Sequence, residues 1–544
     1  MELAVGQYTR RGPIGALEKL CPIFKGAGVG TVVMSFLLGT YYNVIIAWAI
    51  YYLFESFTSE LPWSNCDPAW AINCFDAWGT NTTVPNGTKS ATEEFFDIVV
   101  LQKSPSMSEM GSFRLELLLA LFAAWVLVYF CLWKSVKSSG KVVYVTATLP
   151  YLLIGAFLWR AVTLPGATKG LQYFFNPRWE LLMDGQVWVA AAAQNFNSIG
   201  IAFGSLIAFS SYNKFSNNIV LDTWAISLTN SFTSLLSGMI VFSTLGNIAL
   251  EQSKDMDEVV AEGPGLVFMV YPQALAKMPY GAIWAVLFFF MLLVLGLDSQ
   301  FATIEVIITS LQDGFPKWLK KNLKHHEILV LLVCLVSFIC GLPNVMQGGI
   351  YFFKLIDYYA ANISLMYLAF FEVVSIVWVY GAGRLARNVQ AMTGRLPSLY
   401  FRGCWYITAP VLIMAIWIFS IVDHERPTYN KGEYNYPDWA IGIGWVIASL
   451  SIVPIPVFAV IAVYKAKGAT ILEKVQNSFK SQIEEFSCCG GVSSCMADDV
   501  NEEEFPDRQL KLCMYNEGET TEVKTTTEVD EKKDINETSL HGSA

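Results

Sequence analysis

The feature that most constrains this chain is a series of apolar segments, each long enough for a helix to cross the hydrocarbon core of a membrane, about 20 residues. Of its 544 residues, 54% are hydrophobic and 15% are charged, whereas a soluble domain has about 25% charged residues. The ten segments lie at 28–55, 113–133, 142–163, 187–210, 219–247, 281–311, 327–347, 349–380, 399–421 and 437–464. The sequence therefore predicts an all-α polytopic membrane protein.

Charge and motif content argue against several classes of function. The net charge of −10 says little about nucleic acid, because much of the acid lies near the C-terminus, and we expect no nucleic-acid partner. We find no nucleophile–base pair, no Cys/His spacing typical of a metal site and no phosphate-binding loop, so we do not expect an enzyme. Residues 1–26 lack the charged start and apolar core of a cleavable signal peptide.

Basic residues predict the direction of each crossing, because cytoplasmic loops are enriched in Lys and Arg. They cluster before the first segment, between the second and third, before the seventh and before the ninth. If every segment crosses, these clusters fall on one side, and both termini are cytoplasmic. The members are Arg10, Arg11, Lys19, Lys25, Lys134, Lys137, Lys141, Lys317, Lys320, Lys321, Lys324, Arg384, Arg387, Arg395 and Arg402.

The loop at 57–112 has the features of an extracellular segment. Cys66 and Cys74 lie eight residues apart and predict a disulfide in an oxidising compartment. Asn81 and Asn86 each begin an N-glycosylation sequon. A third sequon, at Asn536, falls on the cytoplasmic side and is expected to carry no glycan. The remaining cysteines of the core are most simply reduced thiols; they are Cys21, Cys131, Cys334, Cys340 and Cys404.

The C-terminal region differs in character from the membrane-spanning core at 28–464. Residues 465–544 form the predicted cytoplasmic tail, which is rich in Glu, Lys, Thr and Asp from about residue 500 onward. That composition is typical of a disordered segment. Cys488 and Cys489 are either palmitoylated or an unmodified pair.

The fourth segment, 187–210, has a polar centre that contains glycine. In hydrocarbon every backbone N–H and C=O must be paired, so such a centre needs a structural reason. One interpretation is a buried helix with a polar seam. The other is a helix broken near the middle of the membrane, whose freed groups coordinate ions and substrate. The polar and glycine residues are Gln194, Asn195, Asn197, Ser198, Gly200 and Gly204.

Two acidic residues lie inside apolar segments. Asp298 is followed by Ser299 and Gln300, and its segment contains no basic residue. A carboxylate in a membrane is costly and indicates a functional site, here for a cation. The alternative is a structural ion pair with a residue from another segment. Asp357 is the second such acid, and it has no evident partner nearby in the sequence.

Two further features each have two interpretations. Asn230 and Ser234 are four residues apart and so face one side of their helix. They fit either a binding site or a seam of hydrogen bonds between helices. The loop at 251–279 contains an amphipathic piece, and it is either a lid over a vestibule or a structured connector.

Several motifs together resemble those of the neurotransmitter:sodium symporter family. They include GQYTRRGPIGALEKLCPIFKGAG, YYNVIIAWAIYYLFESF, QNFNSIGIAFGS, MLLVLGLDSQF and YPDWAIGIGW, and the resemblance extends from Gly6 to about Tyr464. The branch is similar to carriers of GABA and related amino acids or osmolytes, in particular inebriated-type insect transporters. The resemblance implies two inverted five-helix repeats plus two helices. It also implies sodium- and chloride-coupled symport of a small amino acid, neurotransmitter or osmolyte across the plasma membrane.

The resemblance also implies roles for individual residues, which we carry over by motif. The first sodium site takes Ser198 and Asn230, and the second takes Leu295 through its backbone carbonyl, Asp298 and Ser299. The chloride site takes Tyr8, Gln194, Ser198 and Ser234. The substrate pocket takes Leu38, Tyr42, Phe196, Asn197, Phe203, Gln300 and Thr303, with Tyr42 meeting the substrate carboxylate. Asp357 matches the acid of a gate. Related carriers usually have Phe at the position of Asn197, so a more polar substrate is expected.

The chain departs most from the family at its start. Met1 aligns within the second family helix, so 1–27 matches the end of that helix and a cytoplasmic loop. The family's first helix, which supplies sodium ligands and the arginine partner of Asp357, has no counterpart. We expect such a chain, expressed alone, to hold only part of each sodium shell, to drive no uptake and to be largely retained inside the cell. There are two alternatives. The chain is a non-transporting form that associates with full-length transporters and modulates them, or the sequence is an incomplete gene model.

Overall fold

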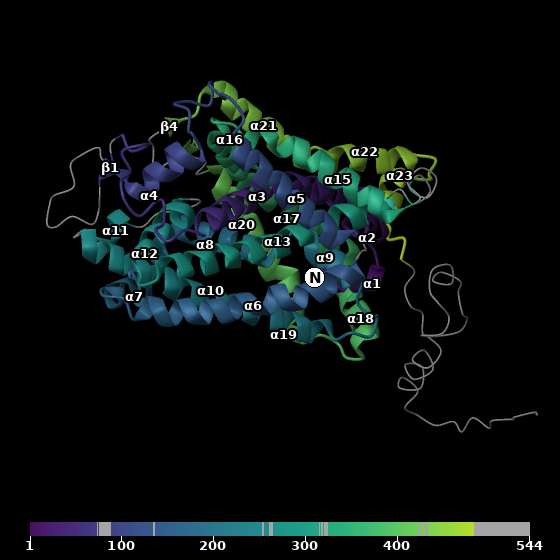
Figure 1. Ribbon diagram of the computed structural model, residues 1–544. Coiled ribbons are helices and arrows are strands. Elements are labelled where there is room, and N and C mark those ends of the chain that lie inside the picture. The colour runs from purple at the N-terminus through teal and green to yellow at the C-terminus, as the bar shows by residue number, and fades with distance from the viewer. Residues whose placement is uncertain are drawn as a thin grey trace, which may run out of the picture. The chain divides into compact units, whose positions relative to one another are not determined.

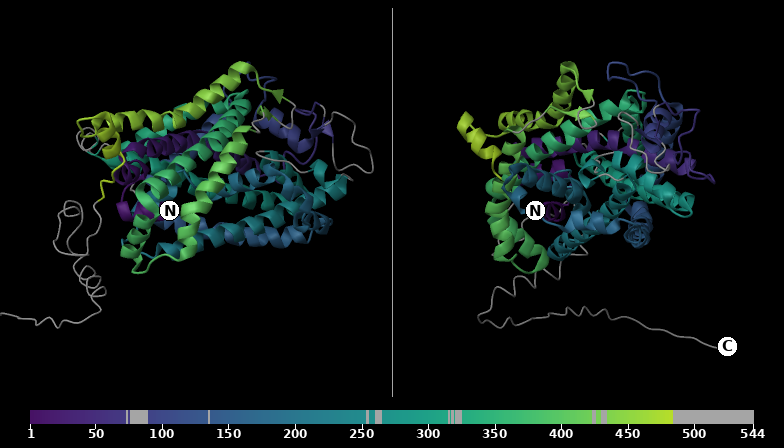
Figure 2. Two further views of the ribbon diagram at one scale, coloured as in Figure 1. Left: turned by 180° about the vertical axis from the view of Figure 1, so that it is seen from behind. Right: turned by 90° about the vertical axis from the view of Figure 1, so that its left-hand side faces the viewer.

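The computed structural model describes residues 1–72, 74–75, 89–133, 136–252, 255–259, 265–314, 316, 319, 325–422, 426–429 and 434–483. They form a set of packed helices with two small two-stranded sheets (Figures 1 and 2). The all-α fold predicted from the sequence is confirmed. The expected glycan sites, the cysteine pair at 488–489 and the tail beyond residue 483 lie outside the described residues.

Nine stretches of the described residues are long and apolar enough to cross a membrane, and they match nine of the ten expected segments. Four contain helices of other types as well as α-helix. The spans are η1 (Pro22–Phe24) with α3 (Lys25–Glu55), α5 (Leu115–Leu132), most of α6 (Val136–Val162), most of α10 (Ile219–Gln252), α13 (Gly281–Gly314), α15 (His326–Gly341) with η5 (Leu342–Val345), α16 (Gly349–Ile356) with η6 (Asp357–Ser364), α17 (Leu365–Val373), η7 (Val374–Gly381) and α18 (Ala382–Thr393), α19 (Leu399–Gly403) with η8 (Cys404–Thr408) and α20 (Ala409–Val422), and α21 (Asp438–Ile452) with α22 (Pro454–Lys465).

The tenth expected segment, 187–210, contains two separate helices. They are α8 (Gly185–Ile199) and α9 (Ser205–Ser211). The other described elements are α1 (Glu2–Thr9), α2 (Pro13–Leu20), β1 (Cys74–Phe75), β2 (Lys89–Ser90), α4 (Ala91–Glu94), η2 (Phe95–Val100), α7 (Ala167–Phe175), η3 (Trp179–Met183), α11 (Met256–Val259), η4 (Leu266–Val270), α12 (Tyr271–Lys277), β3 (Thr428–Tyr429), β4 (Tyr434–Asn435) and α23 (Ile471–Ser478). Strand β1 pairs with β2 in parallel, and β3 pairs with β4 antiparallel.

Helices α3 and α13 pack along each other in the middle of the bundle, with α6 and α10 near one edge and α21 and α22 near the opposite edge (Figure 1). Small residues permit the close approach of α3 and α13. A Cβ atom on Gly296 would lie only 2.8 Å from Cγ1 of Ile46, so a larger residue at position 296 would push the two helices apart. This contact brings Asp298 and its neighbours on α13 against the centre of α3.

Aromatic rings close the bundle at the end where α3 reaches Glu55, which we name the Glu55 end. Tyr52 of α3 stacks on Phe289 of α13 with ring centroids 4.8 Å apart. Trp48 meets Phe268, which lies in the loop expected at 251–279, at 5.6 Å. The Tyr52 hydroxyl donates a hydrogen bond to the Phe268 carbonyl at 3.1 Å. The described part of that loop is therefore folded and packs against α3.

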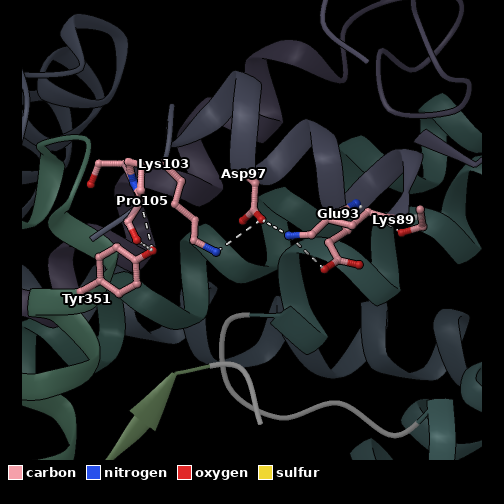
Figure 3. A network of polar contacts seen from close by, with 8 residues as sticks. Lys89, Glu93, Asp97, Lys103, Pro105 and Tyr351 are labelled. Atoms are coloured by element: carbon pink, nitrogen blue, oxygen red, sulfur yellow. Dashed lines mark hydrogen bonds and ion pairs between the residues drawn. The ribbon is translucent and has the colours of Figure 1, made fainter. Parts of the chain in front are cut away.

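Ion pairs join parts of the loop before α5 to each other, and a tyrosine of α16 contacts this loop (Figure 3). The Asp97 carboxylate lies 2.8 Å from Nζ of Lys89 and 3.5 Å from Nζ of Lys103. The Tyr351 hydroxyl of α16 donates to the Ser104 carbonyl at 3.1 Å. In this loop the expected disulfide between Cys66 and Cys74 is confirmed. The core cysteines expected to be reduced are free thiols; they are Cys21, Cys131, Cys334, Cys340 and Cys404.

Candidate functional site

The fourth expected span is broken at its glycines, which decides between the two interpretations of its sequence. Helix α8 ends where Gly200 adopts φ +77°, and α9 begins after Gly204, which adopts φ +76°. Ala202 between them also has a positive φ, +63°. Glycine enters this left-handed region without steric cost because it lacks Cβ. The glycine region at 200–204 is therefore a helix break that follows the polar residues of α8, and the backbone groups of the break must be satisfied by other parts of the chain.

Two buried side chains satisfy backbone groups of the break. The Ser35 hydroxyl of α3 donates to the Phe203 carbonyl at 2.6 Å, and the Ala202 N–H donates to a carboxylate oxygen of Glu2 in α1 at 3.0 Å. A Cβ on Gly204 would come within 2.5 Å of Pro13, so the break also fits closely against α2. Sequence reasoning missed Ser35 and Glu2, because they are 168 and 200 residues from their partners and share no motif with them.

The two side chains expected at the first sodium site are in contact. The Ser198 hydroxyl, on the last turn of α8, donates to Oδ1 of Asn230 on α10 at 2.7 Å. The pair lies beside the helix break. Oxygen atoms are the ligands that hard cations prefer, so the chemistry of this pair fits sodium.

The four residues expected at the chloride site are not joined by direct contacts. Gln194 is exposed on α8 and Ser234 is exposed on α10, while the Ser198 hydroxyl donates a hydrogen bond to Asn230. Tyr8 is buried in α1, and no hydrogen bond between described residues joins it to the other three. All four side chains are neutral donors, which suits an anion, but their grouping stays a prediction.

The residues expected at the second sodium site form one turn of α13. The Ser299 hydroxyl donates to the Leu295 carbonyl at 3.3 Å, and Asp298 lies next to Ser299 in the chain. Oδ1 of Asp298 accepts a hydrogen bond from the Thr146 hydroxyl of α6 at 2.6 Å. A carboxylate, a hydroxyl and a carbonyl make a donor set of oxygen alone, which fits sodium. The contact with Thr146 was not foreseen from the sequence.

The expected substrate residues are divided between α3, α13 and the helix break. The side chain of Tyr42 faces Ser299 of α13. Gln300 is fully buried, and its amide donates to the Gly39 carbonyl at 3.0 Å. The Thr303 hydroxyl donates to the carbonyl of Ser299 at 3.0 Å. The others are Leu38, which is partly buried on α3, Phe196 and Asn197 at the end of α8, and Phe203 in the break.

Asp357, the expected gate acid, has a partner that the sequence did not reveal. The Tyr41 hydroxyl donates to Oδ1 of Asp357 at 3.2 Å. Asp357 is also the first residue of the π-helical stretch η6. Such stretches are rare and often occur at functional sites. Tyr41 and Tyr42 are adjacent on α3, so one point of this helix approaches both the acid and the second sodium turn.

Comparisons with known proteins point in the same direction as this geometry. The model of the sodium:neurotransmitter symporter family matches residues 1–466. A Drosophila melanogaster protein named sodium- and chloride-dependent GABA transporter ine is 52% identical over 520 residues, which cover 95% of this chain and 55% of that protein. The Rattus norvegicus sodium- and chloride-dependent GABA transporter 2 is 43% identical over 86% of this chain and 78% of its own length. The Bos taurus sodium- and chloride-dependent taurine transporter is 42% identical over 86% of this chain and 76% of its own length. The chain thus spans about half the length of the Drosophila relative.

Proposed function

Because this chain belongs to the sodium:neurotransmitter symporter family, we propose that it moves a small amino acid, neurotransmitter or osmolyte across the plasma membrane together with sodium and chloride ions. The observation that carries the proposal is the break between α8 and α9. It supplies backbone groups inside an apolar segment, where a protein otherwise has none to offer a ligand.

The proposed ion sites lie on two elements. Ser198 and Asn230 contribute to the first sodium site, and Leu295, Asp298 and Ser299 contribute to the second. Sodium is a co-transported substrate here, and these residues bind it through oxygen. For chloride we propose Tyr8, Gln194, Ser198 and Ser234, whose neutral N–H and O–H groups donate to the anion without adding charge of their own. The dependence of both relatives named for GABA on sodium and chloride supports this assignment.

Coupling between ions and substrate follows from shared elements. On α8, Ser198 of the first sodium site is adjacent to Asn197 of the substrate pocket. On α13, Ser299 of the second sodium site is adjacent to Gln300 and faces Tyr42 of α3. A ligand that orders one of these turns therefore also orders residues that bind the other ligand. Two ligands that favour the same arrangement raise each other's affinity, which is the thermodynamic basis of coupling.

The proposed substrate is a small zwitterion. Tyr42 offers a hydroxyl to its carboxylate, while the Gln300 and Asn197 amides make the pocket more polar than aromatic residues would. Among the relatives, one is named for taurine and two for GABA, and these names support the substrate class without selecting one member. We further propose that both termini are cytoplasmic and that Asp357 acts in the gate at the Glu55 end of the pocket.

A second candidate function is association with a full-length transporter of the same family. It is favoured by the exposure of polar side chains on α8, namely Gln194 and Asn195. Unpaired polar groups in hydrocarbon cost about 1–3 kcal/mol each by mutational measures, so a covering polypeptide would stabilise this surface. Co-purification of the tagged chain with a transporter, together with a changed surface level of that transporter, would support this role.

Uptake measurements test the proposed transport. Cells that express the intact protein should accumulate radiolabelled GABA or taurine in sodium chloride, and replacement of sodium by choline should reduce this uptake to background. Replacement of chloride by gluconate should reduce it as well. Uptake that is unchanged without sodium would contradict symport. Absence of uptake of any amino acid, with altered trafficking of a co-expressed transporter, would favour the second candidate.

A further inference from the structure

One side chain outside the expected sites contacts the carboxylate of the second sodium turn. The Thr146 hydroxyl of α6 lies 2.6 Å from Oδ1 of Asp298 on α13. Within the described part of the chain, this hydroxyl is the one hydrogen-bond donor to Asp298, and Asp298 forms no ion pair there. The half-buried Asp298 carboxylate therefore has a neutral hydrogen-bond partner on another helix, 152 residues away in the sequence.

The Thr146 hydroxyl contacts a carboxylate on another helix, which the nearby helical threonines do not. Threonine hydroxyls in helices commonly donate to the carbonyl one turn earlier in the same helix. Thr148, two residues further along α6, does this, with its hydroxyl 2.7 Å from the Tyr144 carbonyl. Thr233 of α10 does the same with Thr229 at 2.8 Å. The Thr146 hydroxyl lies within hydrogen-bond distance of a charged group on another helix.

The contact involves only one of the two carboxylate oxygens. Oδ1 of Asp298 accepts the hydrogen bond from Thr146, so Oδ2 remains for another ligand. The bond also fixes the plane of the carboxylate relative to the turn that contains the Leu295 carbonyl and the Ser299 hydroxyl. The arrangement is thus compatible with a cation on one oxygen and the threonine on the other.

We propose that Thr146 is a positioning residue that stabilises the Asp298 carboxylate when no cation is bound and thereby lowers the affinity of this site for sodium. This inference rests on the proposed function, because it assumes that Asp298 binds sodium. A hydroxyl donates more strongly to a bare carboxylate than to one whose charge a cation already neutralises. Thr146 therefore stabilises the empty site more than the occupied one, which weakens binding and assists release on each cycle.

The test uses the purified intact protein and measures binding without transport. Its unfolding temperature is recorded against sodium concentration, with choline chloride keeping the ionic strength constant, because a bound ion stabilises the folded state. Thr146→Val removes the hydroxyl and keeps the branched shape, and it should lower the sodium concentration at the midpoint about 5-fold. Thr146→Ser retains a hydroxyl and should restore the wild-type midpoint. Thr148→Val, the matched control in α6, should leave the midpoint unchanged.

Two further variants distinguish a failure of the role proposed for Thr146 from a failure of the proposed sodium site. Thr146→Ala also removes the hydroxyl, and it must shift the midpoint in the same direction as Thr146→Val. An unchanged or higher midpoint in either variant, with the sodium effect abolished by Asp298→Asn, would overturn the role of Thr146 and leave the sodium site intact. A lower unfolding temperature without sodium and an unchanged midpoint would mean a merely structural role and would equally contradict it. A normal sodium effect in Asp298→Asn would instead refute the proposed sodium site itself.

Discussion

The two halves of the candidate site differ in how completely the chain supplies their partners. In the half formed by α3 and α13, Gln300 is fully buried against the Gly39 carbonyl, and Asp298 is held by Thr146. In the half formed by α8 and α10, Ser198 contacts Asn230, whereas Gln194 and Ser234 are exposed. The first half is therefore organised by contacts within the described chain. The second half has polar groups that are available to a ligand or to a further polypeptide segment.

This difference indicates where ligand binding has the larger structural effect. A side chain that already has partners changes little when an ion arrives, so its contribution to affinity comes from pre-organisation. A side chain without partners gains them on binding and becomes ordered. We therefore expect the α8–α10 half to respond most to ions and the α3–α13 half to act as the fixed frame. The helix break connects them, because Ser35 of α3 binds the Phe203 carbonyl.

The largest expected effect on this comparison comes from Gly204→Ala, which disturbs the connection between the halves. Alanine would be strained at φ +76°, and its Cβ would approach Pro13 to 2.5 Å, so we expect a loss of about 3 kcal/mol of stability. Gly200→Ala is the matched control. It has a similar φ but its Cβ would meet only the flexible Ser205 hydroxyl at 3.1 Å, so the loss should be about 1 kcal/mol. Unfolding temperatures of the purified variants measure the difference, and equal losses would show that the fit against α2 is unimportant.

Ser234→Glu should have a smaller effect, which is confined to the α8–α10 half: it should change the chloride requirement of uptake. A fixed carboxylate in this position should replace the mobile anion, because both offset the positive charge of sodium nearby. Uptake by the variant should then be independent of external chloride while remaining dependent on sodium. Thr229→Glu, about 140° around α10 from position 234, serves as the control and should keep the chloride requirement. An active Ser234→Glu variant that still needs chloride would remove Ser234 from the proposed anion site.

The sequence was sufficient to predict the spans and to raise the break as one of two interpretations of 187–210, because both have local patterns. Apolar length predicts a crossing helix, and Gly200 and Gly204 with polar neighbours predict an interruption. The contacts that stabilise these elements have no such pattern. Packing of segments that are distant in the sequence brings Thr146 to Asp298 and Glu2 to Ala202. No sequence pattern in one segment of either pair identifies its partner in the other. The Ser198–Asn230 contact was predicted only through the family resemblance.

The smallest expected effect concerns the loop at the Glu55 end, which neither half of the site includes. Asn81 and Asn86 should carry glycans and Asn536 should not, because only the first two lie on the extracellular side in the proposed topology. Glycosidase treatment should therefore change the gel mobility of the intact protein. Asn81→Gln and Asn86→Gln should each reduce that change, with uptake nearly unaltered. A change lost only in Asn536→Gln would reverse the proposed orientation.

The central claim is that α13 contributes a sodium site to a coupled transporter, and Asp298→Asn tests it most directly. The substitution keeps the shape of the side chain and removes its charge, so sodium-dependent uptake by the intact protein should fall by at least about 100-fold while its surface level is preserved. Asp97→Asn, in the ion-pair network at the Glu55 end, is the matched control and should retain sodium-dependent uptake. Normal sodium dependence in Asp298→Asn, measured as uptake against sodium concentration, would contradict the account.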